Sequence, residues 1–328
     1  NKSREEMMIA LEAGIGTFVV DNFYELKTLN GLAEEKGIVQ NIMLRITPGV
    51  EAHTHEYIKT GQIDSKFGFT LTDGQAWDAV LMALNSPNLY FKGLHCHIGS
   101  QIFEVESFQH TIELMTEFMT KIKKEAGHEL AELNLGGGFG IFYTPGDLPP
   151  SPKQWANTIM NHVKSQIEKR GLTMPRVIIE PGRALISPAG ITLYTVGADK
   201  EVTGIRKYIA VDGGMNDNPR PALYEAKFTA LIANKADRKA EETVSIAGKC
   251  CESGDMLIWD AKLPKAEAGD ILAVFATGAY TYSMSSNYNR IPRPAMVLVN
   301  EGNADIIIER ETYEDLVRKD KLPKRLEK

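Results

Sequence analysis

The first half of the chain alternates short apolar runs with stretches of helical periodicity, and this alternation constrains the fold more than any other feature. The strand-like runs are 17–20, 41–46, 89–98, 132–135 and 176–179, and the helical stretches between them are 22–36, 72–85, 105–126 and 153–170. A further helix, capped by Ser3 with Glu6 in the capping-box position, is predicted at the start of the chain. Repeated strand-then-helix units predict a parallel sheet covered by helices.

Polar or glycine-rich residues follow each later strand of this predicted sheet. They are Arg45, His95, His97, residues 136–138, Glu180 and Arg183. Barrel enzymes assemble their sites from strand ends on one face, so this clustering favours a (β/α)8-type TIM barrel whose front strands lie outside the sequence. A doubly wound sheet is the alternative fold.

The chain after about residue 187 has a different pattern, because strand-like runs follow one another without long helices between them. These runs are 191–196, 207–211, 228–232, 243–246, 270–274, 295–299 and 304–308, and a short helix is predicted over 309–317. Such a pattern is typical of a β-sandwich or small β-barrel. The sequence therefore predicts a (β/α) barrel domain over 1–187 and a β-rich domain over 188–328.

Composition excludes several functional classes for these 328 residues. The net charge of −6 and the absence of a basic stripe argue against nucleic acid as a partner. The longest apolar runs are too short to span a membrane. Three cysteines, at 96, 250 and 251, form a poor disulfide framework and indicate a reducing, cytoplasmic location.

The stretch from Arg176 to Arg183 reads as a buried strand that ends in a charged loop. Its β-branched residues run directly into Glu180, a proline, Gly182 and Arg183. A carboxylate at such a strand end either forms a structural ion pair with Arg183 or points into a cleft as part of a site. The stretch alone leaves both interpretations open.

A glycine-rich segment, Gly136-Gly137-Gly138-Phe-Gly140, follows another predicted strand. It does not match the dinucleotide fingerprint, because Ile141 occupies the third glycine position and no helix follows at once. The segment instead fits a loop whose backbone N–H groups approach a phosphate closely. An ordinary tight turn is the alternative.

Two imidazoles in His95-Cys-His97 have the spacing of metal ligands, and His53 and His55 repeat it. A metallohydrolase is therefore a competing hypothesis. The other histidines, at 110, 128 and 162, lie in or beside predicted helices, and later strands supply none. We therefore predict no metal site and favour a histidine that stacks on an aromatic cofactor or binds substrate, with a core histidine as the alternative.

Three segments of the β-rich half carry further candidate groups. Arg220 and Tyr224 follow a turn-rich loop and could bind a carboxylate or form a surface salt bridge. Cys251 beside Glu252 could be a proton donor or a small buried side chain. Tyr280 follows a strand in Gly278-Ala-Tyr280. Each of these signals is weak by itself.

The ordered set of these motifs resembles the alanine-racemase-like, fold-type III decarboxylases that depend on pyridoxal 5′-phosphate. The motifs are His95-Cys-His97-Ile-Gly-Ser100, Gly136-Gly137-Gly138, Glu180-Pro-Gly182-Arg183, Asp212-Gly-Gly-Met, Arg220-Pro-Ala-Leu-Tyr224, Cys251-Glu252 and Gly278-Ala-Tyr280. The resemblance covers essentially the whole chain. It is closest to members that act on meso-2,6-diaminopimelate, and it implies conversion of that substrate to L-lysine with release of CO2, in lysine biosynthesis.

The resemblance also implies a role for each candidate around the cofactor. Glu180 would face the pyridine nitrogen, and His97 would stack on the ring. Ser100 and the amides of Gly136, Gly137 and Gly138 would hold the phosphate. Gly182, Arg183 and Tyr280 would complete the cofactor-binding set.

The resemblance assigns the remaining candidates to the substrate. Arg183, Arg220 and Tyr224 would bind its distal carboxylate, Glu252 its distal amine, and Tyr280 would also contact it. Cys251 would donate a proton to the carbon that loses CO2. The Cys-Glu loop of such enzymes serves the partner subunit, so a homodimer with shared active sites is implied.

One family feature is missing from the sequence. Family members carry the lysine that anchors the cofactor in a Tyr-Ala-x-Lys segment, and no such segment occurs here. We therefore expect an N-terminally truncated chain that is inactive alone. The alternatives are a related decarboxylase of ornithine, arginine or carboxynorspermidine type, and a non-catalytic homologue.

Overall fold

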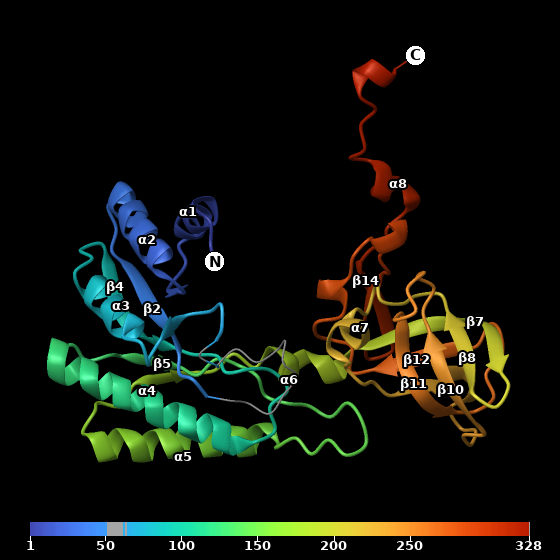
Figure 1. Cartoon of the computed structure of the whole chain (residues 1–328), viewed down its shortest axis with the longest axis horizontal. Helices are drawn as coiled ribbons and strands as arrows, with labels where there is room; N and C mark the ends of the chain where they lie inside the picture. The colour runs from blue at the N-terminus through green and yellow to red at the C-terminus, as the bar shows by residue number, and fades with distance from the viewer. Residues whose placement is uncertain (51–61, 63, 328) are drawn as a thin grey trace. The chain divides into compact units, whose positions relative to one another are not determined.

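The computed structural model describes residues 1–50, 62 and 64–327, which form two compact units (Figure 1). The first unit comprises residues 1–141 and 148–184, and the second comprises 142–147 and the chain from 185 onward. The domain boundary between 187 and 188 remains a prediction.

A parallel sheet forms the centre of the first unit. Its strands are β1 (Phe18–Val20), β2 (Gln40–Thr47), β3 (Phe69–Thr70), β4 (Leu89–His95), β5 (Glu132–Asn134) and β6 (Arg176–Ile178). The order is β1-β2-β4-β5-β6, with β3 paired to β2, and every pairing is parallel. This order follows the sequence without the reversal that a doubly wound sheet requires, so the barrel architecture is favoured.

Helices cover the sheet of the first unit. They are α1 (Arg4–Glu12), α2 (Phe23–Lys36), α3 (Gln75–Leu84), α4 (Val105–Ala126), α5 (Pro152–Arg170) and the short α6 (Gly182–Ile186). The helices α4 and α5 lie side by side (Figure 1). Phe108 of α4 stacks on Phe139 at 5.1 Å between ring centroids, and Trp155 of α5 contacts both rings. Because Phe139 lies within the glycine-rich segment 136–140, this aromatic cluster anchors that segment to the core.

The helix predicted at the start of the chain is confirmed. Ser3 caps α1, and the Glu6 side chain completes the capping box. Lys2, just before the cap, donates from its backbone N and from Nζ to the carboxylate of Glu25, at 2.7 and 2.9 Å. Glu25 also accepts from the backbone N of Asp21 at 2.9 Å. The first residues are thus attached to α2 through one buried carboxylate.

The second unit is built on a mainly antiparallel sheet. Its strands are β7 (Ile191–Val202), β8 (Arg206–Val211), β9 (Ala230–Ile232), β10 (Glu242–Ala247), β11 (Met256–Leu263) and β12 (Ile271–Phe275), in the order β11-β10-β8-β7-β12-β9. The end strands β11 and β9 contact each other, so the sheet curls toward a closed barrel. A hairpin of β13 (Met296–Asn300) and β14 (Asn303–Ile308) follows.

One strand and three short helices differ from the sequence predictions. Strand β11 was not predicted, because Asp260 and Lys262 interrupt its apolar pattern. The predicted helix over 309–317 is reduced to α8 (Tyr313–Val317), which begins after a capping box at Thr312. The one-turn helices α6 and α7 (Arg220–Tyr224) were also missed, since five residues are too few to show helical periodicity. Among the described helices, none is both long and apolar enough to cross a membrane.

The buried carboxylate of Glu25 gives a stability prediction. Its side chain is 2% exposed, and although burial favours the neutral acid, the hydrogen bonds from Lys2 and Asp21 lower its pKa from 4.5. We expect Glu25→Gln to reduce the free energy of unfolding by about 2 kcal/mol, because three N–H donors, two from Lys2 and one from Asp21, lose a charged acceptor. Urea denaturation measures the change.

Glu35 supplies the matched control, because it also pairs with a residue at the start of the chain, Arg4, but in solvent. Glu35→Gln should cost less than about 1 kcal/mol. A group with a lowered pKa stabilises the fold above its unfolded pKa and loses that effect as pH falls through the folded value. The loss caused by Glu25→Gln should therefore shrink in acid; equal losses for both variants at neutral pH would contradict the assignment.

Candidate active site

Polar side chains occupy neighbouring positions at the carboxyl ends of the parallel strands. The register pairs Arg45 of β2 with His95 of β4, and His95 with Asn134 of β5. Asn134 in turn pairs with Ile178 of β6, two residues before Glu180. Parallel pairing thus brings residues from four separate segments into one row, as expected for a site at the strand ends of a barrel.

Glu180 lies at the end of this row and is held by two neighbours. Asn134 Nδ2 donates to Glu180 Oε1 at 2.8 Å, and His95 Nε2 lies 3.5 Å from Oε2. The hydrogen bond from His95, followed by its charge and the bond from Asn134, outweighs burial and lowers the pKa of Glu180 to about 2. With 49% of its side chain exposed, Glu180 is an ionised carboxylate that remains accessible.

His97 lies just beyond β4 and is held by the glycine segment. The backbone N of Gly137 donates to His97 Nδ1 at 3.1 Å, so that nitrogen is an acceptor. Burial, with the nearby charges of Arg45 and His95, lowers the pKa of His97 to about 4. The imidazole is therefore neutral near pH 7, which suits a ring that packs flat against another ring.

The glycine segment is glycine-rich for steric reasons that the structure makes clear. A side chain at Gly136 would collide with the carbonyl of Cys96, and one at Gly137 with the carbonyl of Glu180. A side chain at Gly138, whose φ is +109°, would collide with the carbonyl of Gly99. The segment is therefore packed between the loops that carry His97 and Glu180.

Backbone hydrogen bonds fix this packing further. The N–H of Gly136 donates to Asn134 Oδ1 at 2.9 Å, and the N–H of Gly137 is used by His97. The N–H of Glu180 donates to the carbonyl of Gly136 at 2.8 Å. Two of the amides expected to bind phosphate thus position side chains of the site in this conformation.

Ser100 and Arg183 form a second pair in the first unit. Arg183 belongs to α6, is buried, and donates from Nη2 to Ser100 Oγ at 2.9 Å. Gly182 begins the same short helix. The contact joins the loop that follows His97 to the short helix that follows Glu180, which the sequence had not predicted.

The second unit holds Arg220 and Tyr224 on α7, one turn apart. The buried guanidinium of Arg220 donates to Tyr143 Oη at 3.0 Å and lies over the rings of Tyr143 and Phe228. Tyr143 Oη also contacts Ser187 Oγ at 3.1 Å. Arg220 is therefore fixed in orientation by aromatic neighbours that the sequence did not reveal.

Cys251 and Glu252 lie on an exposed loop between β10 and β11. Cys251 Sγ is 3.4 Å from Glu252 Oε1, and Asn289 Nδ2 donates to the same sulfur at 3.7 Å. Tyr288 donates a short hydrogen bond to Glu252, which lowers the pKa of Glu252 and raises that of Tyr288 to about 12. The thiol and the carboxylate thus lie side by side, as predicted.

Tyr280 follows β12 in a strained backbone segment. Its φ is +57°, which is unusual for a non-glycine residue, and its side chain is partly exposed. Gly278 precedes it, and a side chain there would collide with the carbonyl of Ile186. Close packing between the 186–190 segment and Gly278 fixes the backbone that presents Tyr280.

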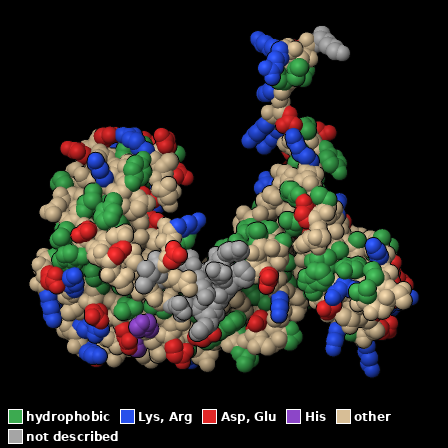
Figure 2. Space-filling model, viewed as in Figure 1, with side chains coloured by type: hydrophobic (Ala, Val, Ile, Leu, Met, Phe, Trp, Pro, Cys, Tyr) green, Lys and Arg blue, Asp and Glu red, His purple; other side chains and the backbone are tan. Residues whose placement is uncertain are grey.

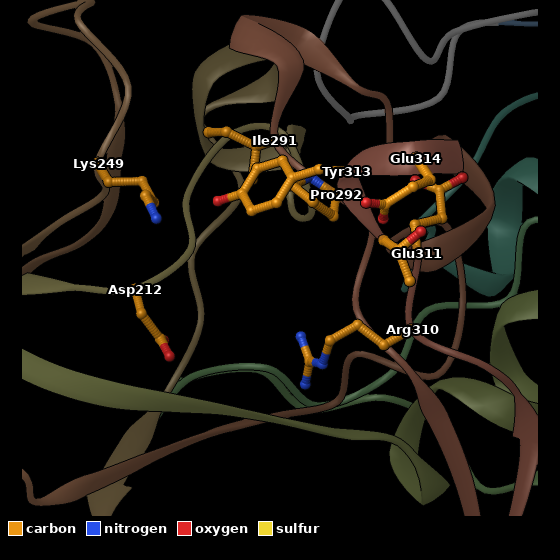
Figure 3. Close-up of a pocket in the computed structure, with 9 residues that line it drawn as sticks. Asp212, Lys249, Ile291, Pro292, Arg310, Glu311, Tyr313 and Glu314 are labelled. Carbon is orange, nitrogen blue, oxygen red and sulfur yellow. The ribbon is translucent and has the colours of Figure 1, made fainter. Parts of the chain in front are cut away.

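The second unit also contains a cavity of about 350 Å³ (Figure 3). It is lined by Asp212, Lys249, Arg310, Tyr313 and five further residues between 291 and 314. None of the predicted site residues is among its lining residues. The candidate groups of the first unit lie instead in the strand-end row and the adjoining glycine segment, and those of the second unit lie on α7 and on the loops that carry Cys251 and Tyr280.

Metal coordination was the competing hypothesis for the histidines. His53 and His55 lie outside the described residues. Within the part of the chain that the structure describes, no group of three or more His, Cys, Asp or Glu is arranged to hold a metal ion. His95 instead contacts Glu180, and His97 contacts Gly137.

Sequence reasoning did not identify two residues that shape the candidate site. Asn134 donates to Glu180 and accepts from the backbone N of Gly136. Its position as a polar residue at the end of an apolar strand could have marked it as a site residue. Nothing in the sequence around Tyr143 indicated its contact with Arg220, because the two residues are 77 positions apart.

Comparisons with known proteins identify the family. The family model described as "Pyridoxal-dependent decarboxylase, pyridoxal binding domain" matches residues 1–187. Diaminopimelate decarboxylase of Halalkalibacterium halodurans is 55% identical over 98% of this chain and 73% of its own length. The Bacillus subtilis enzyme of the same name is 54% identical over the same shares.

Solved structures give the same result. The crystal structure of diaminopimelate decarboxylase from M. jannaschii in co-complex with L-lysine superposes with a TM-score of 0.91 at 41% identity, covering 99% of this chain and 74% of that one. The predicted fold class, a TIM barrel with a β-rich domain, is confirmed by this likeness. The chain therefore belongs to the pyridoxal-dependent decarboxylase family, within the diaminopimelate decarboxylases.

Proposed function

We infer that the protein decarboxylates meso-2,6-diaminopimelate to L-lysine and CO2, with pyridoxal 5′-phosphate as cofactor. The observation that carries this inference is the accessible carboxylate of Glu180, whose pKa is lowered to about 2 at the strand ends of the barrel. The names of the relatives support the same reaction.

The first unit fits the ring of the cofactor. When bound, pyridoxal 5′-phosphate withdraws electrons from the carbon that loses CO2, and a protonated ring nitrogen strengthens this effect. Glu180, ionised at neutral pH, would hold the proton on that nitrogen. His97, neutral because its pKa is lowered to about 4, would pack against the ring without adding a competing positive charge.

The phosphate end is assigned to the loops next to this ring site. Ser100 Oγ accepts from Arg183, and we assign this hydroxyl group to a phosphate oxygen because a serine hydroxyl can also act as a donor. We place the Gly136, Gly137 and Gly138 segment beside the same phosphate because it follows β5 next to His97 and Glu180; the amides of Gly136 and Gly137 would have to leave Asn134 and His97 to donate to it. Gly182 and Tyr280 complete the proposed cofactor set.

The substrate is assigned to charged groups that match its distal end. Arg220 and Tyr224 on α7, together with Arg183, would bind the distal carboxylate. Glu252 would bind the distal amine, and Tyr280 would contact the substrate as well. Fixing the far end of a symmetric diamino acid decides which of its two centres loses CO2.

Cys251 is the proposed proton donor. Its thiol is exposed on the loop and lies beside the carboxylate of Glu252. After CO2 leaves, the electron pair that remains on carbon takes up the thiol proton, and Asn289 can donate a hydrogen bond to the resulting thiolate. The thiol is reprotonated from solvent before the next turnover.

We further propose a homodimer and a cytoplasmic location. The second unit exposes apolar side chains on its strands, among them Leu193 at 64% and Val299 at 71%, and Figure 2 shows hydrophobic groups gathered on its visible surface. Such surfaces are typical of subunit contacts. All three cysteines are free thiols, which suits a reducing compartment. Light scattering that gave a monomer for the holoenzyme would contradict the dimer.

The direct test of function uses a holoenzyme that includes the cofactor-anchoring lysine, and supplies it with meso-diaminopimelate, ornithine and arginine in parallel reactions. We expect CO2 and lysine from diaminopimelate and at least about 100-fold lower kcat/KM with the others, because they lack a distal carboxylate for Arg220. Faster turnover of ornithine or arginine would assign the protein to a sister activity. A holoenzyme that binds diaminopimelate without releasing CO2 would contradict catalysis.

Two adjacent cysteines allow a test of the proton donor. We expect Cys251→Ala to lower kcat by about 100-fold while KM changes less than about threefold, because proton donation acts in a chemical step. Cys250→Ala is the matched control and should leave kcat within about threefold of the wild type. A loss confined to KM in Cys251→Ala would remove this residue from the proton-transfer step.

The role of Arg220 is tested by a change that keeps its charge. Arg220→Lys removes the planar fork, so we expect KM for diaminopimelate to rise by about 10-fold or more. Arg206→Lys on β8, where the arginine contacts Asp260, serves as control and should leave KM unchanged. If Arg220→Lys lowered kcat alone, the residue would act on the reacting centre instead of the distal carboxylate.

A further inference from the structure

The carboxylate of Asp255 is buried between two loops of the second unit. Asp255 immediately precedes β11 and is 3% exposed. Its Oδ1 accepts from the backbone N of Met215 at 2.7 Å, and its Oδ2 accepts from the backbone N of Cys250 at 2.7 Å. The side chain of Asp255 therefore holds two loops at the start of β11. One is the 212–218 loop, which leads to Arg220, and the other is the 248–254 loop, which carries Cys251 and Glu252.

Backbone contacts reinforce this connection. The N–H of Lys249 donates to the carbonyl of Gly213 at 3.0 Å, and the N–H of Gly248 donates to the carbonyl of Asp255 at 2.8 Å. The N–H of Asp255 donates to the carbonyl of Glu252 at 3.0 Å. The loop that presents the thiol is thus closed on itself and attached to its neighbour by short polar contacts.

Two glycines leave the space that this carboxylate occupies. A side chain at Gly214 or at Gly248 would collide with the Asp255 carboxylate. Neither glycine has a positive φ, so neither is required by backbone conformation. Gly254, in the same loop, also has an ordinary φ, but a side chain there would meet nothing within 4 Å.

We propose that Asp255 is a positioning residue for the decarboxylase reaction: its buried carboxylate fixes the loop that presents Cys251 and Glu252 relative to the loop that leads to Arg220. This inference rests on the proposed function for its kinetic consequence. Its structural part concerns the loops alone and is measurable without turnover.

The neighbouring thiol of Cys250 reports on the position of this carboxylate. Cys250 is half-buried, and its Sγ lies 3.8 Å from Asn216 Oδ1. Burial, then the charge and the hydrogen bonding of Asp255, raises the pKa of Cys250 to about 11, while Glu252 adds a smaller effect of the same sign. Displacing or neutralising Asp255 should therefore make Cys250 both more accessible and more readily ionised, so it should react faster with an alkylating reagent.

The experiment compares the holoenzymes of Asp255→Asn, Gly248→Ala and Gly254→Ala. Asp255→Asn places an NH2 group against the backbone N–H of either Met215 or Cys250, so one of these hydrogen bonds is lost. Gly248→Ala keeps the carboxylate but displaces it, because the added methyl group would collide with it. Gly254→Ala is the matched control, since it adds the same methyl group to the same loop in open space. The rate of Cys250 alkylation by iodoacetamide is read by peptide mapping, and kcat and KM are measured alongside.

We expect Cys250 alkylation to accelerate by about 10-fold in Asp255→Asn and in Gly248→Ala, and to stay within about twofold of the wild type in Gly254→Ala. The value of kcat/KM should fall by about 10-fold or more in the first two variants only, because small displacements of a reacting group are costly. Asp270→Asn controls for general destabilisation. That buried carboxylate accepts from Lys235 and from the backbone N of Glu267, and its loss should leave Cys250 alkylation unchanged.

Equal alkylation rates in Gly248→Ala and Gly254→Ala would overturn the proposal whatever the activity of the enzyme. Accelerated alkylation with unchanged kcat and KM would also overturn it, because Asp255 would then hold the loop without positioning the reaction. A wild type that releases no CO2 from diaminopimelate would contradict the proposed function, while the alkylation rates would still decide the structural part.

Discussion

The candidate chemistry depends on keeping one carboxylate charged at the end of a parallel sheet. Glu180 is surrounded by groups that favour its ionised form: Asn134 donates to one oxygen and His95 lies beside the other. Burial works in the opposite direction, and the neighbours outweigh it. Because these neighbours come from β4 and β5, the charge state of Glu180 is a property of the strand register and not of its local sequence.

The glycine segment connects this electrostatic arrangement to the core. Gly136 accepts from Glu180 N–H and donates to Asn134, while Gly137 donates to His97. The following Phe139 is packed between the aromatic rings of α4 and α5. His97, the carboxylate of Glu180 and the hydrophobic core are therefore joined by one short backbone segment. In the second unit, the buried carboxylate of Asp255 likewise holds two loops through their backbone amides, those of Met215 and Cys250.

Local sequence signals predicted the features that depend on local chemistry. Alternating strands and helices, the capping box at Ser3, and the positions of Glu180 and His97 at strand ends could all be read from the chain. Features created by long-range contacts could not. Arg220 is held by Tyr143, which is remote in sequence, and Asp255 looks like any carboxylate in a turn until its two amide donors are seen. Strand β11 was hidden by charged residues on one face.

The most direct test of the central claim measures the ring nitrogen of the cofactor. Holoenzyme loaded with 15N-labelled pyridoxal 5′-phosphate reports by NMR whether that nitrogen is protonated at neutral pH. The arrangement of Glu180, His95 and Asn134 predicts a protonated nitrogen in the wild type and an unprotonated one in Glu180→Gln, with the cofactor still bound. The same protonation state in both proteins would contradict the role of Glu180.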